Sequence, residues 1–142
     1  MKKIAVVYWS GTGNTQAMAE AVAEGVKSAG AEVVIYTASD FSADLMNDFH
    51  GIAFGCPSMG VEVLEETEFE PMFSSLESKL GGKRISLFGS YGWGDGEWMR
   101  NWERTCEDSG AFLVSESVIC NEFPDDEAIE SCKDLGKNLV EL

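Results

Sequence analysis

Two hydrophobic patterns alternate along the chain, and together they predict its secondary structure. Short apolar runs typical of buried parallel strands occupy residues 4–9, 32–36, 52–55, 85–88 and 112–120. Segments with helical periodicity lie between them at 14–28, 69–80, 97–109 and 125–142, with a short polar or helical crossover around 41–49. This alternation is typical of an α/β fold, in which helices cover both faces of a parallel sheet. We therefore expect five parallel strands, with the polar Ser115-Glu116-Ser117 as a candidate interruption of the last one.

Size and composition favour one globular domain spanning residues 1–142. Of the 142 residues, 44% are hydrophobic, which is enough apolar material for one core and excludes intrinsic disorder. No apolar stretch is long enough to cross a membrane, and the N-terminal run is too short for a signal peptide. The cysteines are too widely spaced for a zinc site and are expected to be reduced thiols: Cys56, Cys106, Cys120 and Cys132. These features predict a cytoplasmic protein.

The charge of the chain narrows the choice of partners. There are 25 Asp and Glu residues against 10 Lys and Arg, which gives a formal net charge of -15. A field of this sign repels nucleic acids and anionic membranes, so neither is expected as a partner. Proteins with basic faces are the expected partners. The same charge favours a monomer, because copies of the chain repel one another.

The segment after the first strand has the features of a phosphate-binding loop. In α/β sheets, ligands bind beyond the carboxyl ends of the strands, which points to the connections after strands one, three and four. The first connection leads into a helix N-terminus, where free N–H groups favour an anion. Its glycines let the backbone wrap closely, and its side chains supply hydroxyl and amide donors: Ser10, Gly11, Thr12, Gly13, Asn14 and Thr15. A capped turn without a ligand is the alternative for so short a motif.

Two better-known phosphate motifs are excluded at this loop. A nucleoside-triphosphate loop would end in Gly-Lys-Ser/Thr, but the next lysine is Lys27. A dinucleotide fingerprint would place its third glycine at Gln16. The loop therefore predicts a site for one phosphate monoester.

The other two connections suit a flat ligand. Trp93 lies between Gly92 and Gly94, which leaves its ring free to lie on a planar group, and Tyr91 can extend that platform. Met59-Gly60-Val61-Glu62 resembles a β-turn with glycine at its first central position. The central peptide of such a turn can flip, and it then offers either a carbonyl or an N–H to the edge of a ring.

Together these connections resemble those of one protein family. The chain is similar to short-chain bacterial flavodoxins of the clostridial type, and the similarity extends over essentially its whole length. It rests on residues 8–15, 55–60, 65–71, 87–94 and 121–125. The resemblance implies a flavodoxin-like three-layer α/β/α sandwich, a five-stranded parallel sheet of order 2-1-3-4-5, and non-covalently bound FMN.

The resemblance also implies which residues contact the cofactor. Residues 10–15 would hold the FMN phosphate, and Met59 and Trp93 would sandwich the isoalloxazine ring. The Gly60-Val61 peptide would meet flavin N5, and Glu62 matches the residue that contacts N3. The full set of implied contacts is Ser10, Gly11, Thr12, Gly13, Asn14, Thr15, Pro57, Ser58, Met59, Gly60, Val61, Glu62, Ser90, Tyr91, Gly92, Trp93 and Gly94.

The implied function is that of a low-potential electron carrier, not an enzyme. The protein would pass single electrons between redox proteins, such as flavodoxin or ferredoxin reductases and oxidoreductases, using the semiquinone/hydroquinone couple of FMN. Carboxylates around the site would disfavour the negative charge of full reduction and lower that potential by roughly 0.1 to 0.2 V.

Val61 departs from the family pattern, in which a small or polar residue is more frequent. As the second central residue of a type II turn it would need a positive φ, which a β-branched residue resists. We therefore hypothesise that the peptide flip that stabilises the semiquinone is harder in this chain. An unchanged semiquinone yield in Val61→Gly would contradict the hypothesis.

An FMN-dependent NAD(P)H quinone or nitro reductase is the alternative function. The short chain shows no obvious second site, and its few basic residues offer little to the phosphates of a nicotinamide cofactor. Two flavin-free alternatives with the same architecture fail on residue type. A phosphorelay receiver needs an aspartate where this chain has Cys56-Pro57, and a small tyrosine phosphatase needs an arginine where it has Glu62.

Overall fold

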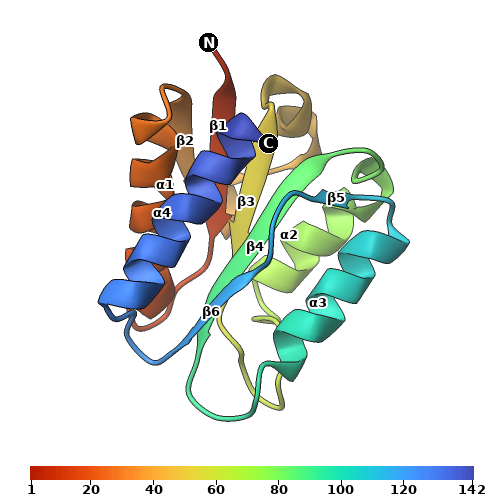
Figure 1. Cartoon of the computed structure of the whole chain (residues 1–142). Coiled ribbons are helices and arrows are strands. Elements are labelled where there is room, and N and C mark those ends of the chain that lie inside the picture. The colour runs from red at the N-terminus through yellow and green to blue at the C-terminus, as the bar shows by residue number, and fades with distance from the viewer.

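A parallel β-sheet runs through the centre of the molecule (Figure 1). The computed structural model describes residues 1–142, and its strands are β1 (Lys3–Tyr8), β2 (Glu32–Thr37), β3 (Gly51–Gly55), β4 (Arg84–Tyr91), β5 (Phe112–Leu113) and β6 (Val118–Asn121). The strand order is β2-β1-β3-β4-β5, and β5 and β6 pair with successive parts of β4. Every pair is parallel. The predicted fold class and strand order are confirmed.

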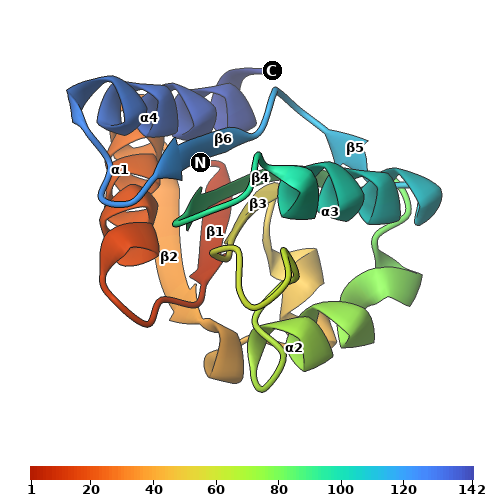
Figure 2. The same cartoon turned by 90° about the horizontal axis from the view of Figure 1, so that it is seen from below.

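Two helices cover each face of the sheet (Figures 1 and 2). They are α1 (Asn14–Ser28) and α4 (Asp126–Glu141) on one face, and α2 (Phe69–Leu76) and α3 (Glu97–Asp108) on the other. Short 3₁₀ turns lie at Ala38–Asp40, before the predicted crossover of residues 41–49, and at Ala43–Asp48, within it; another follows α2 at Glu77–Lys79. None of the helices is both long and apolar enough to cross a membrane.

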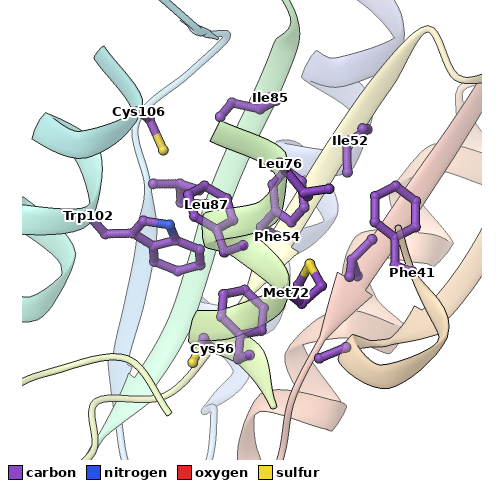
Figure 3. Close-up of a cluster of buried hydrophobic side chains, with 14 of the residues drawn as sticks. Phe41, Ile52, Phe54, Cys56, Met72, Leu76, Ile85, Leu87, Trp102 and Cys106 are labelled. Atoms are coloured by element: carbon purple, nitrogen blue, oxygen red, sulfur yellow. The ribbon is translucent and has the colours of Figure 1, made fainter. Parts of the chain in front are cut away.

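The buried hydrophobic residues form two clusters, one on each face of the sheet. Strand β3 is buried along its whole length, and its side chains alternate between the clusters. Phe54 belongs to the cluster under α2 and α3, whereas Ala53 belongs to the cluster under α1 and α4. Figure 3 shows the first cluster, in which Leu87 of the sheet lies beside Trp102 of α3. Burial on both faces explains why the strands are continuous apolar runs in the sequence.

Some elements differ from their predicted bounds. Strand β4 continues past Phe88 to Tyr91, because its last residues pair with β6. Helix α2 ends at Leu76, where the chain tightens into the 3₁₀ turn. The predicted fifth strand splits into β5 and β6 around Ser115-Glu116-Ser117, so the predicted interruption is confirmed.

Two glycines allow α1 and α4 to come into close contact. A Cβ at Gly25 of α1 would lie 1.9 Å from the carbonyl oxygen of Lys133. A Cβ at Gly136 of α4 would lie 2.2 Å from the carbonyl oxygen of Val22. Both atoms would overlap with the backbone of the facing helix, which cannot move aside without opening the interface.

We predict that Gly136→Ala destabilises the protein. In an exposed helix this change would stabilise by about 1 kcal/mol through helix propensity. Here the overlap with Val22 should instead lower the free energy of unfolding by about 1–3 kcal/mol, measured by urea denaturation. Gly81→Ala is the control, because its Cβ would lie 3.8 Å from the nearest atom, in Ser109. Equal stability of the two variants would contradict the prediction.

Candidate functional site

A cavity of about 230 Å³ opens at the carboxyl edge of the sheet, where the connections after β1, β3 and β4 meet. This edge is the lower end of the sheet in Figure 1. The predicted site residues that line the cavity are Gly11, Thr12, Asn14, Pro57, Ser58, Met59, Ser90, Tyr91 and Gly92. The structure therefore brings the three predicted segments together around one space. The predicted residues that do not line it are Ser10, Gly13, Thr15, Gly60, Val61, Glu62, Trp93 and Gly94.

The connection after β1 presents free backbone donors at the start of α1. Gly13 precedes the helix with a φ of 97°, which glycine adopts without strain. Its N–H donates to the hydroxyl oxygen of Ser10 at 3.1 Å, which shapes the loop. No side chain caps the first turn of α1, and no acidic residue stands in it. These N–H groups and the dipole of α1 are therefore available to an anion.

Thr15 supports the site from inside the protein. Its side chain is buried, and its hydroxyl lies 3.2 Å from the hydroxyl of Ser90 on β4. This hydrogen bond ties the start of α1 to the end of β4. The sequence placed Thr15 among the phosphate donors, whereas the structure gives its hydroxyl a partner within the protein.

The connection after β3 forms a small hairpin from Met59 to Val63. The N–H of each of these two residues donates to the carbonyl of the other, at 2.8 and 2.9 Å. Positive φ values occur at Gly60 (51°) and Glu62 (48°), but not at Val61. The prediction of backbone strain at Val61 is therefore wrong for this conformation. The turn closes at Val63, one residue later than a four-residue turn from Met59 would. The effect of Val61 on a peptide flip stays a prediction.

Glu62 joins the second connection to the third. Its Oε1 accepts a hydrogen bond from the N–H of Glu97, the first residue of α3, at 3.0 Å. Its carboxylate also lies against Gly94, where a Cβ would come within 2.5 Å of the Glu62 Cδ. In this conformation the negative charge of Glu62 stabilises the N-terminus of α3. The implied contact of Glu62 with flavin N3 stays a prediction.

The connection after β4 leaves a large aromatic ring in solvent. Trp93 is 63% exposed, so it does not fold back onto the core and its ring can contact a planar ligand. Tyr91 is half-buried and packs on Trp98 of α3, with ring centroids 5.6 Å apart. Tyr91 belongs to β4 and is therefore held by the sheet, whereas Trp93 lies on the loop.

Two residues that line the cavity, Trp9 and Glu122, were not predicted as site residues from the sequence. The indole N–H of Trp9 donates to a carboxylate oxygen of Glu68 at 3.1 Å. Glu122 follows β6 with a φ of 60°, and its carboxylate lies beside Gly92. Glu62 and Glu122 are the only non-glycine residues with positive φ, and strained residues of this kind gather at functional sites. Trp9 and Glu122 each directly follow a strand of the structure, but the predicted strands 4–9 and 112–120 did not end at these positions, so the available signal of position was displaced by one residue at each strand end.

Glu65 is a buried carboxylate just before α2 that stabilises the fold. It is 5% exposed and accepts hydrogen bonds from the N–H groups of Thr67 (2.9 Å), Glu68 (2.8 Å) and Phe69 (2.8 Å), and from the Thr67 hydroxyl. Burial alone would raise the pKa of Glu65, but these hydrogen bonds hold it below the ordinary value. The Glu65 carboxylate therefore fixes the start of α2.

Two other carboxylates in the connections after β3 and β4, Glu68 and Asp95, also have partners. Asp95 pairs with Arg100 at 3.0 Å, and Glu68 accepts the hydrogen bond from Trp9. Together with Glu62 at the start of α3, these contacts offset part of the negative charge at this edge. The field at the cavity is therefore weaker than the same number of free carboxylates would produce.

The cysteines lie outside the cavity. All four are free thiols, and Cys56, Cys106 and Cys132 are buried. Burial raises the pKa of Cys106 and Cys132 to about 12, and that of the half-buried Cys120 to about 11. Thiols with these pKa values are protonated at neutral pH and are poor nucleophiles.

Comparison with known proteins places this chain in a class of flavin-binding electron carriers. A flavodoxin family model matches residues 6–136. Flavodoxins from Megasphaera elsdenii and Clostridium beijerinckii are 46% and 43% identical, in alignments that cover 94% and 96% of this chain and 96% and 99% of theirs. The solution structure of two-electron reduced Megasphaera elsdenii flavodoxin matches with a TM-score of 0.90 and 47% identity, over 98% of this chain and 99% of that one.

The chain belongs to the flavodoxin family. It is accordingly an electron-transfer protein that uses FMN. The resemblance seen in the sequence is confirmed.

We predict that Glu65→Gln lowers stability in a pH-dependent way. Because the folded pKa of Glu65 is depressed, its contribution is present above the ordinary value of 4.5 and is lost as the pH falls through the folded value. The variant should lose about 1–3 kcal/mol of unfolding free energy at neutral pH. Urea denaturation at several pH values should show this difference shrinking below about pH 4. The exposed Glu66→Gln is the control, and a loss that does not change with pH would refute the assignment.

Proposed function

We propose that residues 1–142 form a single FMN-binding domain that carries one electron at a time, at low potential, between redox proteins of the cytoplasm. The observation that carries this proposal is the cavity at the carboxyl edge, where an uncharged, donor-rich loop meets apolar and aromatic side chains. A phosphate requires the first kind of surface and a flat ring the second. A ligand with both parts uses the whole cavity, and FMN is such a ligand.

The connection after β1 fits the phosphate of FMN. The uncapped start of α1 offers backbone N–H groups, and Ser10, Thr12 and Asn14 add side-chain donors. Gly11 must be small, because a Cβ there would lie 2.9 Å from the ring of Trp9. Backbone can therefore approach the phosphate closely at Gly11.

The connections after β3 and β4 fit the ring. The exposed side chains of Met59 and Trp93 would lie on its two faces, and Tyr91 lines the cavity near them. The Gly60-Val61 peptide would meet the ring edge at N5. Glu62 would turn from the start of α3 to accept a hydrogen bond from N3. Pro57, Ser58, Ser90, Gly92 and Gly94 would complete the contacts, as backbone that approaches the cofactor.

Bound FMN supplies the redox chemistry, because its ring exchanges single electrons. The residues of the chain decide how much negative charge the site tolerates. Glu122 lines the cavity, and Glu62, Glu66 and Glu97 belong to the adjoining segments. These carboxylates raise the free energy of an added negative charge, by an amount that salt reduces. A lowered potential for the second electron follows.

We propose that redox proteins with basic faces, such as flavodoxin or ferredoxin reductases and oxidoreductases, dock at this edge. The formal net charge of -15 attracts such faces over a distance and orients them toward the exposed loop of Trp93. The same charge repels nucleic acids and anionic membranes, and it opposes self-association. A monomer follows from this repulsion.

The alternative of an NAD(P)H quinone or nitro reductase is not favoured. The two relatives from Megasphaera elsdenii and Clostridium beijerinckii carry the name flavodoxin and match over almost their whole length. Arg100, the basic side chain beside the third connection, is already paired with Asp95. Little positive charge is left there for the phosphates of a nicotinamide cofactor.

The phosphate site predicts that Thr12→Glu distinguishes FMN from riboflavin, which lacks the phosphate. Thr12 is exposed and lines the cavity, so a carboxylate there would repel the phosphate without disturbing the core. FMN affinity should fall at least about 100-fold, and riboflavin affinity less than about tenfold. Quenching of flavin fluorescence by the apoprotein measures both. Thr12→Gln is the control of equal size, and equal losses for the two flavins would refute the phosphate site.

Anaerobic photoreduction of the purified protein tests the electron-carrier function. Transfer in single-electron steps should produce a long-wavelength absorption band before the flavin bleaches. NADPH alone should leave the spectrum unchanged. Rapid bleaching by NADPH without a separate reductase would favour the reductase instead, and a colourless protein that does not take up FMN would overturn the cofactor assignment.

A further inference from the structure

A second cavity, of about 330 Å³, lies between α2 and α3 beside the hairpin of Met59 to Val63. Its apolar wall is formed by Val63, Leu64, Phe73, Trp98 and Trp102. Its acidic wall is formed by Glu62, Glu66, Glu70 and Glu77. No basic residue lines it. We name this cavity the α2/α3 groove.

We propose that the α2/α3 groove binds a short basic segment of a redox partner, in which Lys or Arg side chains alternate with apolar ones. The aliphatic parts of such side chains would lie on the apolar wall, and their cationic ends would reach the carboxylates. This proposal rests on the electron-carrier function and adds a docking contact beside the cofactor cavity.

The carboxylates of the groove are not neutralised by the chain itself. The ion pairs of the protein involve Glu24, Glu32, Asp95 and Glu130, and none of them lies in the groove. Two of the groove carboxylates have a neutral contact: Glu70 accepts a hydrogen bond from the Ser74 hydroxyl at 2.6 Å, and Glu62 accepts one from the N–H of Glu97 at 3.0 Å. Like charges around one hollow repel each other, so a bound cation relieves that repulsion. Charge complementarity therefore selects a basic occupant and disfavours a second copy of this acidic chain.

One side chain in the lining of the groove, Trp102, has an unpaired hydrogen-bond donor. Trp102 is 2% exposed and lines the groove. Its indole N–H is buried and has no hydrogen-bond partner. The neighbouring Trp98 differs, because its indole N–H donates to the carbonyl of Cys56 at 3.2 Å. The Trp102 nitrogen is covered by protein atoms in this conformation, so the carbonyl of a bound segment would reach it only if the wall of the groove moves slightly.

The position of the groove links it to electron transfer. Met59 lines the cofactor cavity and Val63 lines the groove, and their backbones are hydrogen-bonded to each other across the hairpin. The hairpin is thus a wall shared by the two cavities. A partner segment seated in the groove would hold its protein against the edge at which the proposed cofactor is exposed.

Titration of the ¹⁵N-labelled, FMN-loaded protein with the peptide acetyl-Lys-Leu-Lys-Leu-Arg-amide at low salt tests the proposal. The NMR signals of the Trp102 indole N–H and of the backbone of Phe73, Asn101 and Thr105 should shift. The shifts should disappear at high salt. A peptide with Gln in place of each Lys and Arg should leave all of these signals unchanged.

Charge variants separate the groove from the general acidity of the protein. Glu70→Gln combined with Glu77→Gln should weaken peptide binding at least about fivefold. Glu20→Gln combined with Glu141→Gln removes the same charge from exposed positions on α1 and α4, and it should weaken binding less than about twofold. Equal weakening by the two pairs would overturn the proposal. Shifts confined to Gly60 and Trp93, or shifts that appear with protein concentration alone, would also overturn it.

The same samples distinguish failure of this proposal from failure of the proposed function. Glu70 and Glu77 do not line the cofactor cavity, so FMN content and photoreduction should match those of the unmodified protein. Normal photoreduction without groove shifts would overturn the docking site and leave the electron carrier intact. Absence of FMN binding by the unmodified chain would overturn both.

Discussion

The close pairing of β3 with β4 at their carboxyl ends is the contact on which the cofactor edge depends. A Cβ at Gly55 would lie 2.1 Å from the ring of Phe88, and a Cβ at Gly89 would lie 2.2 Å from the carbonyl oxygen of Cys56. Only glycine allows the backbones to approach this closely. The ladder then continues beyond β3, where the N–H of Cys56 donates to the carbonyl of Phe88 at 3.1 Å. The second connection is therefore tied to the strand that carries the third.

The remaining segments are positioned from this pair outward. Strand β6 extends the sheet along the last residues of β4 and brings Glu122 to the cavity. The hydroxyl contact between Thr15 and Ser90 ties the start of α1 to the same strand. Four segments that are distant in the sequence thus meet around one hollow. These hydrogen bonds fix the backbone around the cavity, whereas the side chain of Trp93 lies in solvent.

Acidic residues have three different physical roles in this protein. Glu65 is buried and satisfied by hydrogen bonds, so its charge stabilises the fold. Glu62 and Asp95 have single partners near the cavity and carry charge that is only partly offset. The other carboxylates of the α2/α3 groove, Glu66, Glu70 and Glu77, have no cationic partner and share the cavity with its apolar wall. A net charge alone does not separate these roles, because each depends on what the rest of the chain places beside the carboxylate.

The sequence by itself determined the features that depend on near neighbours. Strand burial, the order of strands and helices, and the donor-rich turn of residues 10–15 were predictable, because periodicity and loop chemistry are local. The tertiary structure decided the partners of individual side chains. Three contacts depend on segments far apart in the chain: the hydrogen bond of Glu62 at the start of α3, the hydrogen bond of Thr15 with Ser90, and the position of Glu122 at the cavity. A hydrogen bond acts over a few ångströms in space, and no local pattern records which distant residue the fold brings within that reach.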